Sequence, residues 1–562
     1  CASDCAVTFA DRSNGHDRQR LLPWRNPTMT SMVRATRFLG FGLVAMLAVG
    51  CAILPPGADF PKTKAIALAH PEQTRLGRQF DGAAPAHGGK SAFRLLSVGV
   101  DGFLARAQMI NAAERTLDLE YFIFRQDETG QLLTDALLRA ADRGVRVRVL
   151  VDDGDTLKGD EQIAALSAHP NIDIRIFNPF VYRGHAELFR AVEFAFNASR
   201  LDYRMHNKLL VVDNAIALVG GRNIGDQYFQ VDPDSQFGDD DVFAAGPIVK
   251  ALSKTFDDFW NSALAIPVAA LGDGKHSDAA LNAYRRTLDE HRRQLKADGT
   301  DYASRVASGE PLAGMLSGRL PLVWANAQVV YDSPDKKEVE NGEIVGKLMH
   351  RTVADAAAAV RSELLMVTPF LIPGKDGMQL FTDLRKRGVR VRILTNSLES
   401  TPELVAQSGY MQYRIPLLEE GVELYEVRAL LGNARGSGES SAATRSGNYA
   451  LHAKLFVFDR ERLYIGSMNF DQRSHHLNTE VGLIIDSPEL ARQTAARFEA
   501  IVVPANSYAL ALRKDPTGGP PELLWRTRED GKDIEYDSEP ARSPWQRFKV
   551  DLFSLLPLDK EL

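Results

Sequence analysis

Cysteine is scarce in this chain: its 562 residues include three, Cys1, Cys5 and Cys51, and none follows Cys51. This shortage excludes a disulfide framework for the main body of the protein. Such a protein either occupies a reducing compartment or is exported and is large enough to fold without disulfides. The composition, 44% hydrophobic and 25% charged, is that of a globular protein with several domains or one large repeated domain.

An excess of positive charge is also missing. Lysine and arginine total 67 against 73 aspartates and glutamates, which gives a formal net charge of -6. The chain as a whole therefore has no basic field that would attract DNA or RNA, and we expect no nucleic-acid partner. A local basic site is still compatible with this balance.

A hydrophobic run long enough to cross a bilayer is lacking near the start of the chain. The run FLGFGLVAMLAVG (38–50) has 13 residues, whereas a membrane-spanning helix needs about 20. The run follows Arg34 and Arg37 and ends at Cys51, an order typical of a secretory signal peptide. The segment LAVGC also resembles the lipobox of bacterial lipoproteins, in which the cysteine is lipidated.

These features predict a lipoprotein-type signal peptide at 29–50, lipidation at Cys51 and a proline-containing tether at 51–90. Residues 1–28 are expected to be a translated upstream segment. The protein is then exported and held at a membrane on the periplasmic side. A plain signal peptide or an uncleaved anchor, with Cys51 incidental, is the alternative, and peripheral attachment to the cell membrane then replaces the lipid anchor.

One motif occurs twice: MHNKLLVVDNAIALVGGRN (205–223) returns as LHAKLFVFDRERLYIGSMN (451–469). Upstream, QLLTDALLRAADRGVRVRVLVDD (131–153) parallels QLFTDLRKRGVRVRILTN (379–396), and each predicts an amphipathic helix, a glycine and an alternating strand. Strand–helix–strand order predicts an α/β fold. The duplication predicts two mixed β-sheet halves with flanking helices, related by a pseudo-twofold axis, with the active site at their interface.

Each copy of the motif pairs a histidine with a lysine two residues later. His206 with Lys208, and His452 with Lys454, therefore face the same side of a strand. Two lysines can neutralise the oxygens of a phosphodiester. One histidine can attack phosphorus while the other protonates the leaving oxygen, which gives two easier steps through a phosphohistidine.

An aspartate follows each histidine by seven residues, so Asp213 and Asp459 complete the two predicted catalytic motifs. This odd offset places each aspartate on the opposite face of a continuous strand from the histidine. We therefore expect both aspartates to be structural, pairing with backbone amides or closing the turn, rather than to carry protons.

Residues after each motif complete the predicted site. Glycine lets backbone approach a ligand closely and asparagine offers amide donors, so the predicted substrate-binding residues are Gly221, Asn223, Ser467 and Asn469. Asp241 and Glu480 each open an apolar strand beyond the motif. We expect both carboxylates to hold the far imidazole nitrogen of a catalytic histidine and so to orient it.

No spacing of histidine, cysteine or carboxylate residues typical of a metal site occurs, and we expect neither a metal nor another cofactor. The adjacent His475 and His476 would diverge on an extended segment, so we expect them at the surface or behind the site.

Two segments outside the repeat carry further expectations. AALNAYRRTLDEHRRQLKADG (279–299) predicts a charged surface helix. The tail has one apolar helical stripe that lies either on a membrane or, as we expect, on its own domain: Trp545, Phe548, Leu552, Leu555 and Leu556. The predicted boundaries are 91–265 for the first half, 266–320 for a helical connector, 321–510 for the second half and 511–562 for the tail.

The duplicated H-x-K-x4-D motif with a downstream G-G/S-x-N resembles the phospholipase D superfamily over about residues 95–505. The segments most similar to its bacterial cardiolipin synthase branch, in particular the cardiolipin synthase C subgroup, are MHNKLLVVDNAIALVGGRNIGDQYF, GSMNFDQRSHHLNTEVGLII and WQRFKVDLFSLLP. The resemblance implies a duplicated phospholipase D-like fold and phosphohistidine chemistry. By analogy, His206 is the nucleophile and His452 the acid and base.

The same resemblance implies transfer of a phosphatidyl group onto phosphatidylglycerol at a membrane surface, with phosphatidylethanolamine as a second candidate substrate. A hydrolytic phospholipase D that releases phosphatidic acid would share every motif residue. A nuclease is disfavoured by the net charge of -6, and a non-catalytic lipid-binding protein by the two intact histidine–lysine pairs. The sequence leaves open the phosphatidyl donor and the oligomeric state.

Overall fold

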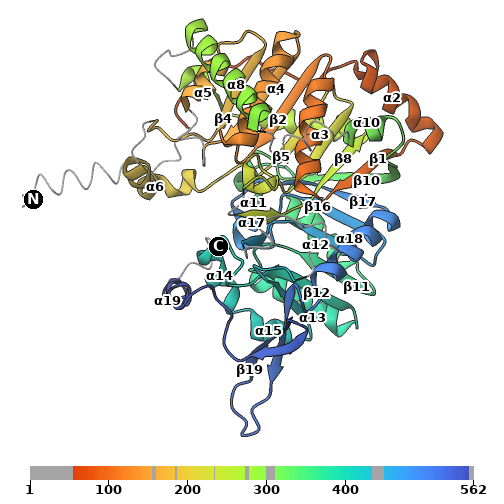
Figure 1. Ribbon diagram of the computed structural model, residues 1–562, viewed down its shortest axis with the longest axis vertical. Helices are drawn as coiled ribbons and strands as arrows, with labels where there is room; N and C mark the ends of the chain where they lie inside the picture. Colours follow the sequence, from red (N-terminus) through yellow and green to blue (C-terminus); the bar gives the residue numbers. More distant parts are fainter. Residues whose placement is uncertain are drawn as a thin grey trace, which may run out of the picture. The chain divides into compact units, whose positions relative to one another are not determined.

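Figure 1 shows a computed structural model of the chain. The residues that it describes are 55–154, 160–183, 187–232, 235–271, 277–298, 311–432 and 448–555. The predicted upstream segment, the signal peptide and the lipidation site Cys51 lie outside these residues and remain predictions, as do the predicted domain boundaries.

The first half is built on a mixed sheet with the strand order β9-β4-β3-β2-β5-β6-β8-β1. Strands β2, β3 and β4 run parallel to one another, and the remaining neighbours are antiparallel. The strands are β1 Ser91–Leu96, β2 Thr116–Tyr121, β3 Arg146–Asp152, β4 Ile172–Phe177, β5 Lys208–Val212, β6 Ile216–Gly220, β8 Asp241–Ala245 and β9 Ala265–Pro267.

The second half repeats this order as β18-β13-β12-β11-β15-β16-β17-β10, again with a parallel trio at β11, β12 and β13. The equivalent strands β1 and β10 pair antiparallel with each other and join the two sheets, as a pseudo-twofold axis between them requires. The strands are β10 Val323–Tyr331, β11 Glu363–Val367, β12 Arg390–Asn396, β13 Glu423–Val427, β15 Leu455–Phe458, β16 Arg462–Gly466, β17 Val481–Asp486, β18 Ser507–Arg513, β19 Glu522–Glu529 and β20 Lys532–Tyr536.

Helices cover both sheets (Figure 1). In the first half and the connector they are α2 Arg75–Ala83, α3 Gly99–Ala112, α4 Glu128–Asp142, α5 Asp160–Leu166, α6 Glu187–Leu201, α7 Ile248–Trp260, α8 Asp278–Asp298 and α10 Pro311–Leu316. In the second half and the tail they are α11 Lys336–Glu340, α12 Met349–Ala358, α13 Gly374–Lys386, α14 Leu404–Met411, α15 Arg414–Glu419, α17 Gln472–His476, α18 Pro488–Ile501 and α19 Pro544–Phe553.

The repeated helix–strand unit shows why the sequence folds this way. The Asp127 side chain caps α4 by accepting a hydrogen bond from the Gly130 amide. Leu133 and Leu137, four residues apart, are buried on one face of this helix. The chain leaves α4 through Gly144 at φ 90° and leaves α13 through Gly388 at φ 79°. Glycine adopts this left-handed conformation without the steric cost of a Cβ atom.

The two halves share a hydrophobic core. Val219 and Val242 on β6 and β8 belong to one buried cluster with Leu463 and Leu483 on β16 and β17. The short strands β7 (Gln236–Gly238) and β14 (Tyr449–Leu451), one from each half, also pair in parallel. These contacts fix the two copies of the motif relative to each other, so the interface can hold a site of defined geometry.

The connector helix α8 spans most of the predicted charged helix and packs its buried Leu281, Tyr284 and Leu288 against the first half. The tail differs from its prediction. Its helix α19 lies against α14 and buries Val550, while Trp545 and Phe548 stay 60% and 53% exposed. The described part of the apolar stripe therefore does not pack on the domain, because the helix turns a different face inward, and Leu556 lies outside the described residues. Among the described helices, none has the length and apolar character needed to span a membrane.

Candidate active site

Strands β5 and β15 bring both motifs to the interface between the halves. Lys208 begins β5 and Lys454 stands directly before β15. His206 and His452 precede these strands and are buried, with 7% and 8% of their surface exposed. Lysines are rarely buried without a functional or structural reason, yet both lysines are 1% exposed.

A carboxylate from the second half holds His206. Its ring nitrogen Nδ1 lies 3.0 Å from Glu480 Oε1 and 2.9 Å from Glu480 Oε2. Glu480 also accepts hydrogen bonds from the hydroxyls of Ser467 and Ser474. A carboxylate beside Nδ1 favours the imidazole tautomer that is protonated at Nδ1. The lone pair of Nε2 then remains available to act as a nucleophile or a base.

A carboxylate from the first half holds His452 in the same way. Its Nδ1 lies 2.5 Å from Asp239 Oδ2, and its backbone amide donates to the Gly238 carbonyl at 2.7 Å. Each half therefore supplies one motif histidine and the carboxylate that contacts the motif histidine of the other half. Neither half holds a complete site.

The prediction that Asp241 orients a histidine is wrong. Its carboxylate accepts hydrogen bonds from Arg106 at 2.8 Å and from Arg222 at 3.1 Å, deep inside the first half. Strand register explains the error: Asp241 lies opposite Gly220, as Gly482 lies opposite Gly466. The position equivalent to Glu480 is therefore two residues earlier, at Asp239.

Burial lowers the pKa of both histidines, that of His206 well below its usual value and that of His452 to about 3. The charges of Lys208 and Lys454 lower both values further. Because each lysine acts on both histidines, the four side chains form one site. Without a bound anion, both imidazoles are neutral at neutral pH.

The lysines are also affected by burial, which lowers the pKa of Lys208 well below its usual value and that of Lys454 to about 8. Glu480 and Asp239 oppose this effect by favouring the ammonium forms. The Lys208 ammonium donates to the His206 carbonyl at 2.6 Å, and Lys454 donates to the His452 carbonyl. The site is thus prepared for an anion that would stabilise both ammonium groups.

The two orienting carboxylates differ in charge state. Burial raises the pKa of Glu480 to about 7, against the opposing effect of Lys208. Burial also acts to raise the pKa of Asp239, but His452 and Lys454 outweigh it and hold this pKa below its usual value. Asp239 is therefore ionised at neutral pH, whereas Glu480 titrates near it.

The motif aspartates lie on the far side of the strands from the histidines. The Asp213 carboxylate accepts hydrogen bonds from the backbone amides of Glu114, Arg115 and Thr116 at 2.8–2.9 Å. Asp459 accepts equivalent bonds from the amides of residues 361–363. Both aspartates have positive φ, 53° and 54°, at the turn that follows the motif strand. They join this turn to the start of a neighbouring strand and do not reach the histidines.

The four predicted substrate-binding residues have different surroundings. A Cβ atom on Gly221 would lie 2.1 Å from Asp239 Oδ1, so this glycine makes room for the orienting carboxylate rather than for a ligand. Asn223 is fully engaged: its Oδ1 accepts from the Ile123 amide and its Nδ2 donates to the Tyr228 hydroxyl. The Ser467 hydroxyl donates a hydrogen bond to Glu480. Asn469 differs, because its buried Oδ1 has no hydrogen-bond donor among the described residues.

Aromatic rings surround both histidines. The Phe122 ring centroid lies 5.0 Å from that of His206, and Phe237 stacks on His452 at 5.2 Å. Sequence reasoning missed these rings and Asp239. Three consecutive aspartates, 239–241, lead into β8, which begins at Asp241, and Asp239 and Asp241 share strand parity. Only the strand register distinguishes which of them reaches the site.

His475 and His476 lie on the short helix α17 and not on an extended segment as expected. Their rings are 4.4 Å apart, and His475 stacks on His350 at 4.0 Å. In the described part of the chain, no group of three or more histidine, cysteine or acidic side chains is arranged to hold a metal ion.

Comparison with known proteins shows which family has this arrangement of residues. The family described as "Cardiolipin synthase, PLD-like domain" matches residues 107–260 and 354–502, one match in each half. The chain belongs to the phospholipase D superfamily. Cardiolipin synthase C of Escherichia coli (strain K12) is 34% identical over 487 residues, which cover 84% of this chain and 96% of that protein. This similarity confirms the cardiolipin synthase branch.

Two further relatives extend the comparison. An uncharacterized protein of Helicobacter pylori (strain ATCC 700392 / 26695) is 29% identical over 498 residues, 88% of this chain and 93% of that protein. The crystal structure of phosphatidylserine synthase from Haemophilus influenzae Rd KW20 matches with a TM-score of 0.50 at 14% identity, over 76% of this chain and 91% of that chain. The predicted fold class is confirmed, and the protein is an enzyme of this superfamily, a phosphatidyltransferase or a phosphodiesterase.

Proposed function

We propose that this enzyme is a cardiolipin synthase, which moves a phosphatidyl group onto the hydroxyl of phosphatidylglycerol. The observation that carries the proposal is the pair of buried histidines, each oriented by a carboxylate of the opposite half and flanked by a lysine. Similarity to a protein named cardiolipin synthase C over most of both chains supports the choice of substrate.

In the first step, Nε2 of His206 attacks the phosphorus of the donor lipid. The bond from phosphorus to the head-group oxygen breaks, and His452 supplies the proton that the leaving alcohol takes up. In the second step, His452 removes a proton from the hydroxyl of phosphatidylglycerol. That oxygen attacks phosphorus, the phosphorus–nitrogen bond breaks, and cardiolipin leaves with His206 regenerated.

The first step needs a proton on His452, whereas the second step needs the neutral imidazole. His452 has a pKa of about 3 without substrate, so it holds no proton to donate at neutral pH. A bound phosphodiester places a negative charge beside Lys208, Lys454 and both imidazoles, and raises all four pKa values. Substrate binding thus prepares the acid, and the lysines neutralise the charge that develops on the phosphoryl oxygens.

Burial of the reacting groups favours an alcohol over water as the acceptor. Both histidines are less than a tenth exposed, and Phe122, Phe237 and Tyr228 contact their rings. A site closed in this way limits hydrolysis of the phosphohistidine. Hydrolysis to phosphatidic acid is the competing outcome.

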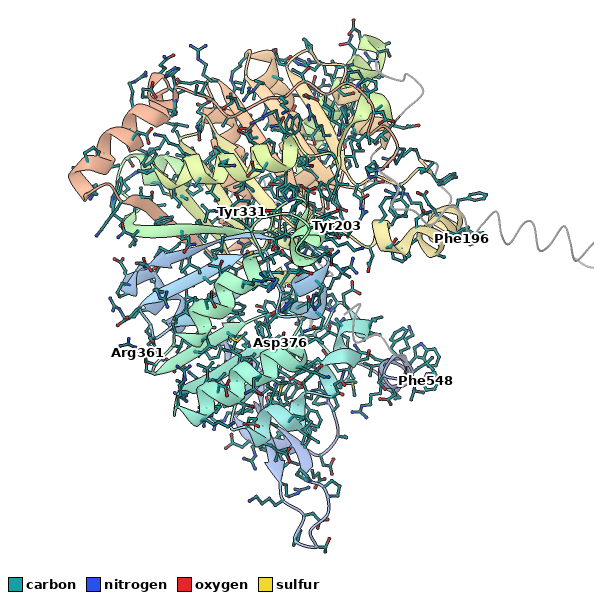
Figure 2. All side chains as sticks on the ribbon, turned by 180° about the vertical axis from the view of Figure 1, so that it is seen from behind. Phe196, Tyr203, Tyr331, Arg361, Asp376 and Phe548 are labelled. Atoms are coloured by element: carbon teal, nitrogen blue, oxygen red, sulfur yellow. The ribbon has the colours of Figure 1, made fainter. Side chains whose placement is uncertain are left out.

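Two apolar surface segments support action at a membrane. In the views of Figures 1 and 2, α6 and α19 project from the same side of the molecule, as the labelled Phe196 and Phe548 show. Their exposed large apolar side chains are Leu188, Phe189, Val192, Phe194, Phe196, Trp545, Phe548, Leu552 and Leu555. Aromatic and aliphatic side chains on the exposed face of a helix are typical of attachment to a lipid interface.

The charges near α19 fit a phospholipid surface. Arg542 and Arg547 donate to backbone carbonyls, and Lys549 lies 5.7 Å from the centroid of the Trp545 ring. None of these three cations forms an ion pair with a described carboxylate. They can therefore contact lipid phosphates while the apolar stripe enters the bilayer.

A product assay tests the proposed reaction. The full chain is incubated with phosphatidylglycerol vesicles, with and without phosphatidylethanolamine, and the products are read by mass spectrometry. We expect cardiolipin together with glycerol or ethanolamine, and the released alcohol identifies the phosphatidyl donor. Phosphatidic acid as the sole product would overturn the proposed transferase and assign hydrolysis.

A further inference from the structure

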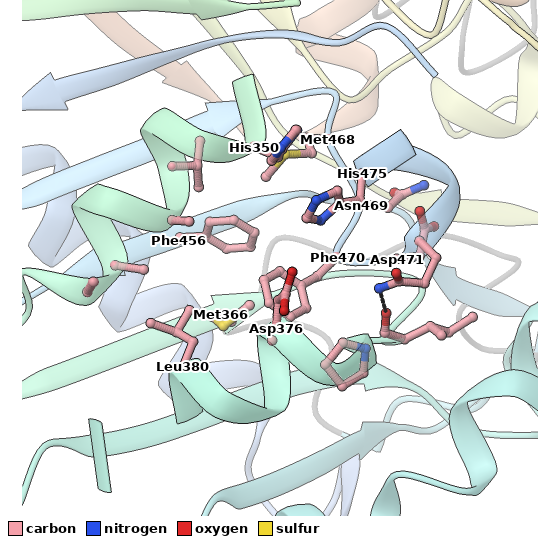
Figure 3. A pocket seen from close by; sticks show the side chains of 18 of the residues that line it. His350, Met366, Asp376, Leu380, Phe456, Met468, Asn469, Phe470, Asp471 and His475 are labelled. Atoms are coloured by element: carbon pink, nitrogen blue, oxygen red, sulfur yellow. Dashed lines mark hydrogen bonds between the residues drawn. The ribbon is translucent and has the colours of Figure 1, made fainter. Parts of the chain in front are cut away.

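The second half contains an apolar cavity of about 230 Å³ between α12 and α13 and the sheet (Figure 3). Its base is formed by Leu364, Met366, Leu380 and Phe456, from β11, α13 and β15. An apolar cavity of about 150 Å³ can hold a benzene-sized molecule. This cavity therefore has room for a longer hydrocarbon segment.

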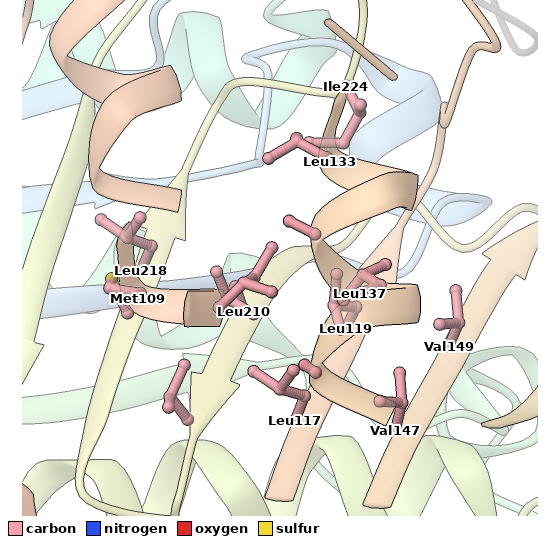
Figure 4. Close-up of a cluster of buried hydrophobic side chains, with 14 of the residues drawn as sticks. Met109, Leu117, Leu119, Leu133, Leu137, Val147, Val149, Leu210, Leu218 and Ile224 are labelled. Carbon is pink, nitrogen blue, oxygen red and sulfur yellow. The ribbon is translucent and has the colours of Figure 1, made fainter. Parts of the chain in front are cut away.

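The first half has a packed core at the equivalent place. Its helices α3 and α4 pack directly against each other, and Figure 4 shows Met109, Leu133 and Leu137 above the sheet residues Leu117 and Leu119. The duplication thus provides an internal comparison, in which one copy of the fold fills this layer and the other leaves it open.

The helices that precede the two equivalent strands differ at one buried position. Leu117 and Leu364 are equivalent, since they pair with Val212 and Phe458, which directly precede the two motif aspartates. Seven residues before these leucines stand Ile110 in the first half and Ala357 in the second. Ala354 and Ala358 line the cavity beside Ala357. Short side chains on α12 leave the volume that Ile110 occupies in the other copy.

The cavity ends at buried polar atoms that make no hydrogen bond to the described residues. Asn469 is 6% exposed and its Oδ1 accepts no hydrogen bond from the described residues, whereas both ends of its counterpart Asn223 are engaged. His350 Nδ1 at the same end is buried 3.9 Å from Glu340 Oε1, too far for a hydrogen bond. Buried polar atoms are seldom left unpaired, so a ligand with a polar end fits this position.

The two histidines at the polar end of the cavity, His350 and His475, are uncharged at neutral pH. Burial and the neighbouring His475 lower the pKa of His350 to about 3. Burial and His476 lower the pKa of His475 to about 4. Neutral imidazoles and an amide suit an ester or a hydroxyl group better than a phosphate.

The cavity adjoins the catalytic site. Asn469 stands two residues after Ser467, whose hydroxyl donates to Glu480. Asp471, which also lines the cavity, is near enough to Lys454 to favour its ammonium form. A lipid whose phosphate lies at the lysines can therefore extend an apolar part toward the cavity.

We propose that this cavity binds one acyl chain of a phospholipid substrate, with the ester or hydroxyl end of that lipid at Asn469. The inference rests on the proposed function and adds to it an asymmetry: the second half holds a lipid chain and the first half does not. The cavity thereby positions one of the two lipids relative to the histidines and makes its recognition dependent on chain length.

The test is a binding titration on the full chain carrying His452→Ala, a substitution that prevents turnover. The ligands are lysophosphatidylglycerols of increasing chain length, each kept below its critical micelle concentration. Each added methylene is expected to tighten a saturable one-to-one interaction about fourfold until the cavity is full. Ala357→Ile, which introduces the residue of the first half, should weaken binding of the longer chains at least tenfold. Ala359→Leu, on an exposed residue just after α12, is the matched control and should bind as the parent protein does.

A second variant keeps the test decisive if Ala357→Ile does not fold. Leu380→Ala enlarges the cavity and should move the plateau in affinity to longer chains. Equal chain-length dependence in the parent, Ala357→Ile and Leu380→Ala proteins would overturn the proposal. Binding is measured without turnover, so its failure is distinct from failure of the proposed function, which the product assay on the wild-type chain decides.

Discussion

Glu480 contacts the ring of His206 although 274 residues separate them along the chain. Asp239 contacts His452 across 213 residues in the reciprocal arrangement. A duplicated fold normally gives two copies of a site, but here the two copies exchange their carboxylates and make one. The shared core between β6, β8, β16 and β17 must therefore hold the halves in register for either histidine to work.

Replacing Asp239 by asparagine should reduce kcat about 10–100-fold, as loss of an orienting partner behind a functional histidine does. The amide no longer fixes the imidazole tautomer of His452, and the pH profile of kcat should shift with it. Asp241→Asn is the control, because Asp241 pairs with Arg106 and Arg222 instead. It should lower the thermal midpoint while kcat stays within about threefold of wild type; an equal loss of kcat in both variants would contradict the assigned roles.

The two histidines should separate in a trapping experiment. A phosphatidyl ester of p-nitrophenol needs no acid for its leaving group, so His452→Ala should still form the phosphohistidine and then hydrolyse or transfer it slowly. His206→Ala should form none. Mass spectrometry of the quenched protein detects the adduct and its position. An adduct on His452 in the His206→Ala protein would reverse the assignment of nucleophile and acid.

Asp213→Asn should destabilise the protein without abolishing catalysis. The variant loses one of three backbone hydrogen bonds and turns an amide donor toward the Glu114 amide, which is expected to cost about 2 kcal/mol. Urea denaturation monitored by fluorescence measures the loss. Asp459→Asn, at a less buried site, should lose less. A fully folded but inert Asp213→Asn protein would show that this aspartate takes part in the chemistry.

The sequence predicts the repeated elements well because their signals are local. Alternating valines, the glycine stops and the histidine–lysine spacing each depend on neighbours within a few residues. The sequence predicts that a carboxylate at the start of a strand contacts each histidine, and Glu480 fits this prediction for His206. The choice of Asp239 over Asp241 for His452 depends on strand register. The exposed stripe on α19 was misjudged because which helix face turns inward depends on α14, a distant element.

The affinity of the site for a phosphodiester should fall as the pH rises through about 8. The pKa of Lys454 is lowered to about 8 by burial, so its ammonium is present below that pH and is lost above it. Binding of glycerophosphoglycerol, measured calorimetrically, should weaken toward tenfold per pH unit above 8. Lys454→Met should bind more weakly and lose this slope. A slope that persists in the variant would assign the titration to another group, with Lys208 the nearest candidate.

The apolar segments on α6 and α19 should control attachment to lipid vesicles. Phe196 is 70% exposed and Phe548 is 53% exposed, and burying one phenylalanine in a bilayer is worth about 1.5–3 kcal/mol. Phe196→Ser and Phe548→Ser should each weaken binding to phosphatidylglycerol vesicles about tenfold or more, and the double variant should combine both losses. Flotation of the full chain with vesicles measures the bound fraction.

Ile66→Ser provides the matched control for this prediction, because Ile66 is 66% exposed and lies outside both segments. It should bind vesicles as wild type does. Activity on short-chain lipids dissolved as monomers should be unchanged in all four variants, since neither phenylalanine contacts the catalytic histidines. If the serine variants bound vesicles normally, the two helices would face something other than the membrane. If the serine variants also lost activity on monomeric lipid, the two phenylalanines would contribute to the catalytic site rather than to attachment of the enzyme to the bilayer.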